Sequence, residues 1–268
     1  MRRTLIACAL ASLLLGGQAA AVPGVDEPST IHVKALRNPE IQKYKAILAG
    51  LDSFDKHHAL APRVPALRFR VQQRGGAGKP EQPLVRIEGE RDFVMPLAID
   101  ADNRFTVPRS EAALDARGEL VLNQKRKYYR IVPEVRTPGL PDNVRRLGDL
   151  RLECKVMIDI AKEEIPLFWV LTLNSVLMTR DWCSFFSEKE RSATFAFKAG
   201  APLVEAILSE GNRSKALKTE KEEFSVGLGD AEWSDEALVE LRFEEAPARA
   251  ASPAAATETA GGTPRTAP

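Results

Sequence analysis

The pattern of apolar and polar positions is strongest between Pro138 and Cys183. A turn at 138–141 precedes Asp142, which occupies the position expected of a helix N-cap. Pro166 interrupts the helical pattern that follows, because a proline ring inside a helix removes a hydrogen bond. The sequence therefore predicts an amphipathic helix from Asp142 to about residue 165. Its apolar positions are Val144, Leu147, Leu150, Cys154, Met157, Ile158, Ala161 and Ile165.

A second helical segment follows Pro166. Residues 167–178, LFWVLTLNSVLM, are apolar on nearly every side of a helix. The segment is too short to cross a bilayer, which takes roughly 20 residues. We expect it to be buried in the core. The alternative is a surface that touches a membrane or a partner, and exposure of Phe168, Trp169 and Leu173 would indicate it.

The N-terminal part of the chain combines one strand pattern with one helix pattern. Residues 30–36 alternate apolar and polar side chains, which is typical of a half-buried strand. Pro39 then stands at a favourable first-turn position, and apolar residues recur at helical spacing as far as Leu51. An amphipathic helix over residues 39 to about 58 is predicted, ending at His57 and His58.

From Leu67 onward the period changes to two, which is typical of strands. The turn-forming residues 100–103 separate two apolar runs, and this predicts a hairpin over residues 97–107. Further strands are predicted before and after the helical pair, so the sheets should be antiparallel. These strands are 67–72, 84–87, 93–99, 119–123, 128–135, 193–198, 215–219, 224–228 and 237–243.

Together these elements predict the fold class and the organisation of the chain. We expect an α+β protein, in which an N-terminal helix and a central helical pair pack on an antiparallel β-sandwich-like body. Residues 22–136 would form the N-terminal β-rich region, and residues 137–245 the helical pair and C-terminal strands of the same compact unit. Residues 246–268 are mostly Ala, Pro, Thr and Gly, so we expect a disordered tail.

The first residues predict export. Arg2 and Arg3 precede a short apolar run, and small residues follow at 19–21, which is the pattern of a secretory signal peptide over residues 1–21. The apolar run is too short for a retained transmembrane anchor. The mature protein should therefore be periplasmic or extracellular.

Two cysteines remain once the signal peptide, with Cys8, is removed. An even pair of cysteines in an exported protein is most simply a disulfide, so we predict a bond between Cys154 and Cys183. Two buried free thiols or a redox-active pair are the alternatives. A redox-active pair is less consistent with the sequence, because the close Cys-x-x-Cys spacing is missing.

Charge and histidine content limit the partners and cofactors. Loss of Arg2 and Arg3 takes the formal charge from +1 to about −1, so nothing indicates nucleic acid as a partner. His32, His57 and His58 are the only histidines, and the sequence holds no metal-binding motif. We predict no metal and no cofactor. The oligomeric state is left open.

The arginines of the 142–165 helix are the candidate contact residues. Arg145 and Arg146 are spaced to pair with Asp149 along a solvated helix surface. Alternatively, Arg145, Arg146 and Arg151 extend to the sheets and fix the orientation of the helix, or they form an anion or partner site. The sequence leaves these alternatives open.

No catalytic constellation stands out in the sequence. There is no Gly-x-Ser-x-Gly motif, and with 37 acidic residues a carboxylate pair is expected by chance. Our leading hypothesis is a non-enzymatic protein of the cell envelope that binds a protein or glycan partner. The alternative is a hydrolase that acts on an envelope polymer through dispersed carboxylates.

Overall fold

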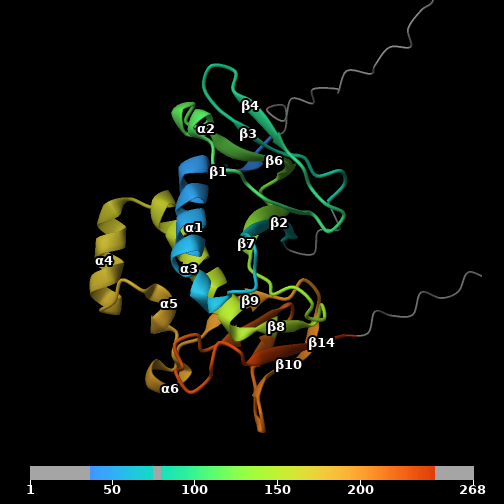
Figure 1. The fold of residues 1–268 in the computed structure, drawn as a ribbon, viewed down its shortest axis with the longest axis vertical. Helices are drawn as coiled ribbons and strands as arrows, with labels where there is room; N and C mark the ends of the chain where they lie inside the picture. The colour runs from blue at the N-terminus through green and yellow to red at the C-terminus, as the bar shows by residue number, and fades with distance from the viewer. Residues whose placement is uncertain (1–36, 75–79, 245–268) are drawn as a thin grey trace, which may run out of the picture. The chain divides into compact units, whose positions relative to one another are not determined.

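The computed structural model describes residues 37–74 and 80–244. Over these residues the chain is an α+β protein with four antiparallel sheets, and the long helix α3, Leu147–Glu164, runs among them (Figure 1). The predicted class, with an N-terminal helix and a central helical pair, is confirmed. The predicted signal peptide, the strand at 30–36 and the tail at 246–268 lie outside the described residues.

The first hydrophobic core lies between two sheets and helix α1, Tyr44–Lys56. The short helices η2, His58–Leu60, and α2, Glu111–Asp115, lie at its margin. One sheet has the order β1-β6-β3-β4 and the other β5-β2-β7. Their strands are β1 Pro39–Lys43, β2 Arg68–Gln73, β3 Val85–Glu88, β4 Val94–Leu97, β5 Arg104–Phe105, β6 Glu119–Lys125 and β7 Tyr129–Glu134.

The second hydrophobic core lies between the two C-terminal sheets and the other side of α3. These sheets have the orders β11-β10-β14-β8 and β12-β13-β9. Helices α4, Leu167–Leu177, α5, Trp182–Phe185, and α6, Glu188–Arg191, connect α3 to them. The strands are β8 Val144–Arg146, β9 Phe195–Lys198, β10 Leu203–Glu210, β11 Arg213–Ala216, β12 Lys218–Glu220, β13 Glu223–Val226 and β14 Leu238–Phe243.

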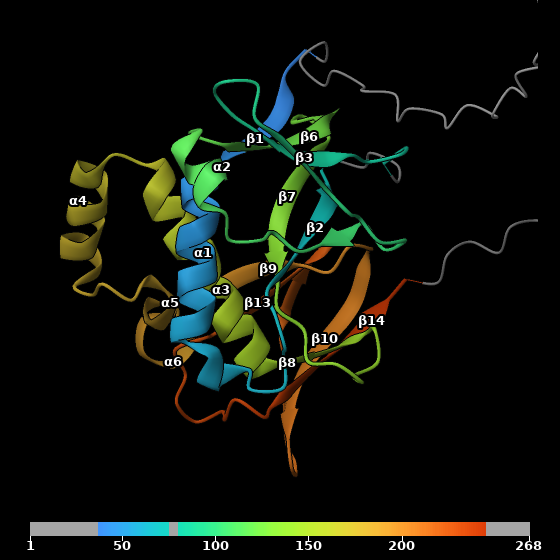
Figure 2. The same ribbon diagram turned by 45° about the horizontal axis from the view of Figure 1, so that its top comes forward.

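Helix α3 contributes to both cores. Leu152 and Val156 belong to the first core, whereas Leu147, Leu150 and Cys154 belong to the second. Helix α1 lies along α3 in both views (Figure 2). Their close approach requires Gly50, because a Cβ atom there would stand 2.7 Å from Ile160 Cγ1. Helix α3 thus has an apolar stripe on each of two faces, and each stripe is buried in one of the two cores.

The predicted helix over residues 39–58 is wrong at its beginning. Pro39–Lys43 is a strand that pairs antiparallel with β6, and the helix begins at Tyr44. The spacing of Ile41 and Tyr44, three residues apart, is helical, but the hydrogen bonds to β6 override it. The partner lies about 80 residues away in the chain, and a local pattern contains no information about such pairing.

The predicted N-cap at Asp142 is also wrong. Residues Val144–Arg146 form β8, which pairs with β14, and α3 begins only at Leu147. The first helical N–H groups of α3 need acceptors. Leu147 and Gly148 donate to the carbonyls of Ala237 and Asp235, at 2.8 and 2.9 Å. Backbone groups of a distant segment therefore take the place of a side-chain cap.

The predicted hairpin over residues 97–107 does not form. The turn itself is present, since Asn103 N–H donates to the Asp100 carbonyl at 3.0 Å. However, β4 pairs with β3 and β5 pairs with β2, so the turn leads from one sheet to another. Turn-forming residues mark where the chain reverses, but they do not determine which strands pair.

Candidate functional site

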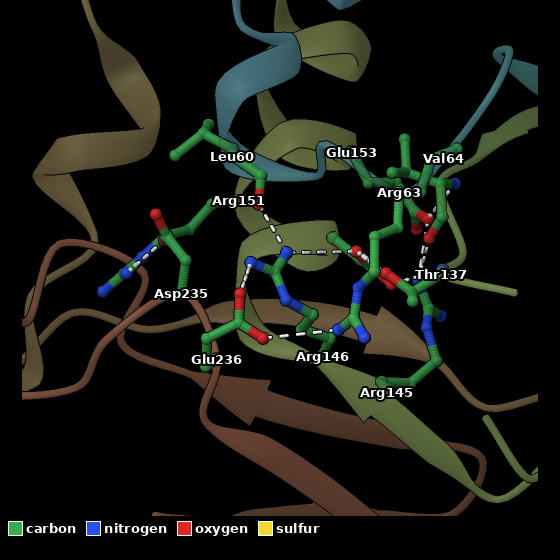
Figure 3. A network of polar contacts seen from close by, with 12 residues as sticks. Leu60, Arg63, Val64, Thr137, Arg145, Arg146, Arg151, Glu153, Asp235 and Glu236 are labelled. Carbon is green, nitrogen blue, oxygen red and sulfur yellow. Dashed lines mark hydrogen bonds and ion pairs between the residues drawn. The ribbon is translucent and has the colours of Figure 1, made fainter. Parts of the chain in front are cut away.

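Arg146 is almost fully buried and links three parts of the molecule (Figure 3). Its guanidinium donates to the Leu60 carbonyl and to Glu236, and its Nη1 lies 3.5 Å from Asp149 Oδ1. Leu60 ends η2 and Glu236 precedes β14, so the side chain fixes α3 between the two cores. Arg146 therefore fixes the orientation of the helix, which is one of the alternatives that the sequence left open.

Arg151 is tied to the C-terminal segment in a similar way. It donates to the carbonyls of Leu228, Asp230 and Trp233 at 2.9, 3.0 and 3.0 Å, and to Asp235 Oδ1 at 2.6 Å. Four acceptors occupy most of the donors that a guanidinium offers. Arg151 therefore holds the loop before β14 against α3, with little capacity left for a ligand.

Arg145 points to the opposite side of α3 from Arg151. It donates to Glu153 Oε2 at 2.9 Å and to the Val135 carbonyl at 3.1 Å. The pair expected between Arg145 and Asp149 is absent, because Asp149 accepts instead from the Thr137 N–H and hydroxyl at 2.6 and 2.8 Å. Of the three predicted arginines, Arg145 is the one that borders a cavity.

The cavity lies between the sheet of β2 and β7, helix α3 and strand β9, and its volume is about 220 Å³. Arg70, Arg130, Arg145 and Lys198 supply its cationic groups, and Phe195 and Phe197 form part of its apolar wall. The sequence pattern did not identify Arg70 and Arg130. Both lie on alternating strands, where outward polar residues are usually solvated. A larger and more open hollow of about 700 Å³ adjoins it at Lys198 and is lined mainly by glutamates.

The pKa values of two carboxylates in this cavity shift in opposite directions. Burial disfavours the charge on Glu134, but Arg70 and Arg104 more than offset this and lower its pKa. Burial raises the pKa of Glu153, although Arg145 acts against the rise. A full charge is thus maintained on Glu134, where two arginines converge, and is disfavoured on Glu153.

Cys154 of α3 and Cys183 of α5 form the predicted disulfide, with their Cα atoms 6.0 Å apart. Both cysteines are buried in the second core. The bond ties the residues after α4 to the middle of α3. Both ends of α4 are thereby attached to the same helix, one through the chain at Pro166 and the other through the disulfide.

Helix α4 is not the buried core helix that the sequence predicted. None of its residues is buried, and six large apolar side chains in and just after it are exposed, from 55% for Trp169 to 85% for Met178. The prediction failed because α1 and the sheets already cover α3, so that α4 contacts mainly α5. Both ribbon views show α4 at the edge of the molecule (Figures 1 and 2).

The helix has an attached face and an outward face. Val170, Leu173, Asn174 and Leu177 are half-buried, at a spacing of i, i+3, i+4 and i+7. Asn174 Oδ1 accepts from Trp182 Nε1 at 2.8 Å and so joins this face to α5. We call the exposed apolar residues the outward face of α4: Leu167, Phe168, Trp169, Leu171, Val176 and Met178.

The hydroxyl groups of α4 bond within the helix. Thr172 Oγ1 donates to the Phe168 carbonyl at 2.9 Å, and Ser175 Oγ donates to the Leu171 carbonyl at 3.0 Å. No charged residue occurs in the helix. The outward face therefore exposes no hydroxyl donor that still needs an acceptor, and burying it would cost little in lost hydration of these groups.

The histidines within the described residues have structural surroundings. His58 Nε2 lies 2.7 Å from the Val64 carbonyl, and its ring packs against Phe54. Burial is the main cause that lowers the pKa of His57. Residues 37–74 and 80–244 contain no group of three or more His, Cys, Asp or Glu side chains that could hold a metal ion. The same residues contain no helix with the length and apolar character required to cross a membrane.

Comparisons with known proteins give no family. No protein-family model matches this chain, and no curated protein and no solved structure is similar enough to count as a match.

Proposed function

We propose that this chain is an exported, non-enzymatic protein of the cell envelope that binds a partner protein through the outward face of α4. The observation that carries the proposal is the exposure of an apolar helix that the rest of the described chain leaves uncovered. Contiguous exposed apolar surface of this kind marks interaction sites in stable proteins. The signal-peptide pattern in residues 1–21 and the disulfide support export.

A protein groove suits α4 better than a lipid surface does. Helices that lie on a membrane have a strongly polar face rich in Lys and Arg opposite the apolar one. The residues of α4 include no Lys or Arg, and its attached face is held by α5. An apolar helix in the groove of a second protein needs anchors at i, i+3 or i+4, and i+7. On the outward face Phe168 and Leu171 are three residues apart, Leu167 and Leu171 four, and Trp169 and Val176 seven, so pairs at each of these spacings are exposed.

The disulfide makes α4 a preorganised ligand. An isolated helix of 11 residues would be marginal in water, so binding would have to form it. Here both ends of the helix are attached to α3, through Pro166 and through Cys183. The conformational entropy of α4 is thus lost when the protein folds and not when it binds, which increases the affinity for a partner.

The alternatives from the sequence receive less support. A glycan would require polar hydrogen-bonding groups beside the aromatic rings, and the two hydroxyl groups of α4 already donate within the helix. For a hydrolase, the split in pKa between Glu134 and Glu153 is of the kind found in acid–base pairs. However, Arg104 donates to Glu134 at 2.5 Å and Arg145 to Glu153 at 2.9 Å, so both carboxylates are already bonded to arginines.

The test is site-specific photo-crosslinking in the envelope fraction. A photoreactive phenylalanine analogue replaces Trp169, and a matched probe replaces Val204 of β10, which is 63% exposed. We expect the probe at 169, but not the probe at 204, to yield one discrete adduct. The captured protein, once purified, should bind the wild-type chain and bind Leu171→Glu/Val176→Glu at least about tenfold more weakly.

The double variant separates binding from folding. Since both side chains are exposed, its melting temperature should stay within about 2 °C of the wild type. The matched variant Val204→Glu should bind like the wild type. An adduct with a second copy of this chain, or binding to lipid vesicles that the double variant loses, would overturn the proposal of a partner protein.

A further inference from the structure

We propose that the cavity between β2, β7, α3 and β9 binds a small organic anion, in which a carboxylate or phosphate group is attached to an apolar ring. This site is distinct from α4 and does not depend on the function proposed for that helix. The inference follows from the charges around the cavity, from arginine groups that lack acceptors, and from the apolar wall.

The cavity contains more positive than negative charge. Four cations, Arg70, Arg130, Arg145 and Lys198, line it, against the three carboxylates Glu134, Glu153 and Glu223. Arg104, which bonds to Glu134 from outside the lining, is also paired with Asp102. Arg70 and Arg104 share Glu134, Arg145 pairs with Glu153, and Lys198 lies opposite Glu223 in the register of β9 and β13. Such an excess in a partly buried site attracts an anion.

Arg130 is the cation left over. Within the described chain no carboxylate lies within 4.0 Å of it, and its Nε and Nη2 donate only to Gln72 Oε1, at 2.8 and 2.5 Å. Burial and then the charge of Arg74 lower its pKa. Both effects disfavour the charged guanidinium of Arg130 and so do not stabilise the folded protein. A cation kept in such surroundings is most simply explained by a ligand that neutralises it.

Two further guanidinium groups of the cavity are incompletely bonded. Arg70 Nε and Arg145 Nε are buried and have no hydrogen-bond partner. A buried donor without an acceptor is unfavourable, and native proteins contain few of them. A small rotation of either side chain toward an oxyanion would supply the missing acceptor. The planar guanidinium suits both carboxylate and phosphate, since it can donate two parallel bonds.

The apolar wall and the volume of the cavity determine which group can carry the acid. Phe195 and Phe197, whose ring centroids lie 5.0 Å apart, form an apolar wall together with Val132 and Met157. A volume of about 220 Å³ falls below the roughly 300–1,000 Å³ typical of drug-sized ligands. The cavity therefore fits one ring that bears one acidic group, with the ring against the phenylalanines and the acid near Arg130.

Binding is tested by titration calorimetry of the purified full chain with benzoate, phenyl phosphate, acetate and the neutral isostere benzamide. We expect benzoate, phenyl phosphate or both to bind, and the tighter of the two identifies the acidic group. Acetate and benzamide should bind at least about tenfold more weakly, because one lacks the ring and the other the charge. Raising the salt from about 0.1 M to about 1 M should weaken the binding.

The variant Arg130→Gln should weaken binding of the preferred acid at least about tenfold. Its melting temperature should not fall, because the change removes a half-buried charge that repels Arg74. The control Arg242→Gln alters an exposed arginine of β14 outside the cavity and should bind like the wild type. Binding of benzamide as tight as that of the preferred acid, no binding of either acid at about 10 mM, or unchanged binding by Arg130→Gln would overturn the proposal.

Discussion

Helices α3 and α4 follow each other in the chain, separated by Pro166. The composition of α3 suggests an exposed helix and that of α4 a buried one, but the structure shows the reverse. Helix α3 carries many charged residues and is buried on two faces, with Asp149 fully covered. Helix α4 carries no charge, and its outward face is exposed. Burial in this protein therefore depends on which elements cover a helix, and not on its hydrophobicity alone.

The comparison also separates two kinds of energetic cost. The charges of α3 lose hydration on burial, and their mutual bonds compensate for this only when every partner is present. The apolar residues of α4 retain an unfavourable contact with water, of the order of 1.5–3 kcal/mol for a fully exposed large side chain. The desolvation of the α3 charges is offset by bonds within the fold. The exposed apolar surface of α4 is not offset, so its burial can stabilise a complex.

The largest expected effect is the loss of Arg146 from α3. Arg146→Ala leaves Asp149 buried and removes the links to Leu60 and Glu236, so we expect a destabilisation of about 3–5 kcal/mol. The melting temperature should fall on the order of 10 °C. Arg63→Ala is the matched control. Arg63 bonds to the same Glu236 but is exposed, and its loss should cost at most about 1 kcal/mol. If Arg146→Ala lowers the melting temperature by only about a degree, the architectural role of this arginine is refuted.

Removal of the disulfide that ties the residues after α4 to α3 should have a somewhat smaller effect. Cys154 and Cys183 are 29 residues apart, and the chain-entropy model gives about 3–4 kcal/mol for closing such a loop. Cys154→Ala/Cys183→Ala should therefore lower stability by this amount in chemical denaturation. Amide hydrogen exchange should also become faster in α4 and α5, since one attachment is lost. Reduction of the wild type with dithiothreitol should reproduce the loss and leave the variant unaffected. Equal stability of variant and wild type would show that the bond contributes nothing.

The smallest of the three effects concerns pH, to which the surroundings of α3 should respond and α4 should not. The pKa of Glu134 is lower in the folded protein than the usual value of about 4.3, so its contribution is present above that pH. It is lost as the pH falls through the lower, folded pKa. Glu134→Gln should cost about 1–3 kcal/mol at pH 7 and flatten the loss of stability below pH about 4.3.

The control for this pH dependence is Glu205→Gln, which alters a carboxylate paired with Arg242 on the exposed side of β10. Denaturation curves measured from acid to neutral pH should keep the wild-type slope in this variant. A slope that Glu134→Gln leaves unchanged would mean that other carboxylates control the acid response.

The sequence was sufficient where a feature depends on local pattern or on cysteine number. It predicted the α+β class, the two helices around Pro166 and the disulfide. It failed at Pro39–Lys43 and Val144–Arg146, because the strands that pair with them, β6 and β14, lie about 80 or more residues further along. Strand pairing at that distance is decided by tertiary contacts.

The candidate sites were harder to predict, for a different reason. An apolar pattern shows that α4 would gain from burial, but not whether an element of the same chain covers it. Likewise, Arg70 and Arg130 lie on alternating strands, where the pattern separates one face of a sheet from the other. It cannot distinguish bulk solvent from a cavity closed by β9.

The position of α3 in both cores has a consequence for the order of events during synthesis. The first core is built mainly from residues between Tyr44 and Val135, but it also requires Leu152 and Val156. The beginning of α3 is held in turn by Ala237, close to the end of the described chain. A ribosome must therefore make the chain beyond Val156 before the first core can close, and beyond Ala237 before the beginning of α3 has its backbone partner. The nascent chain should remain accessible to chaperones until late and then gain its stability in a single step.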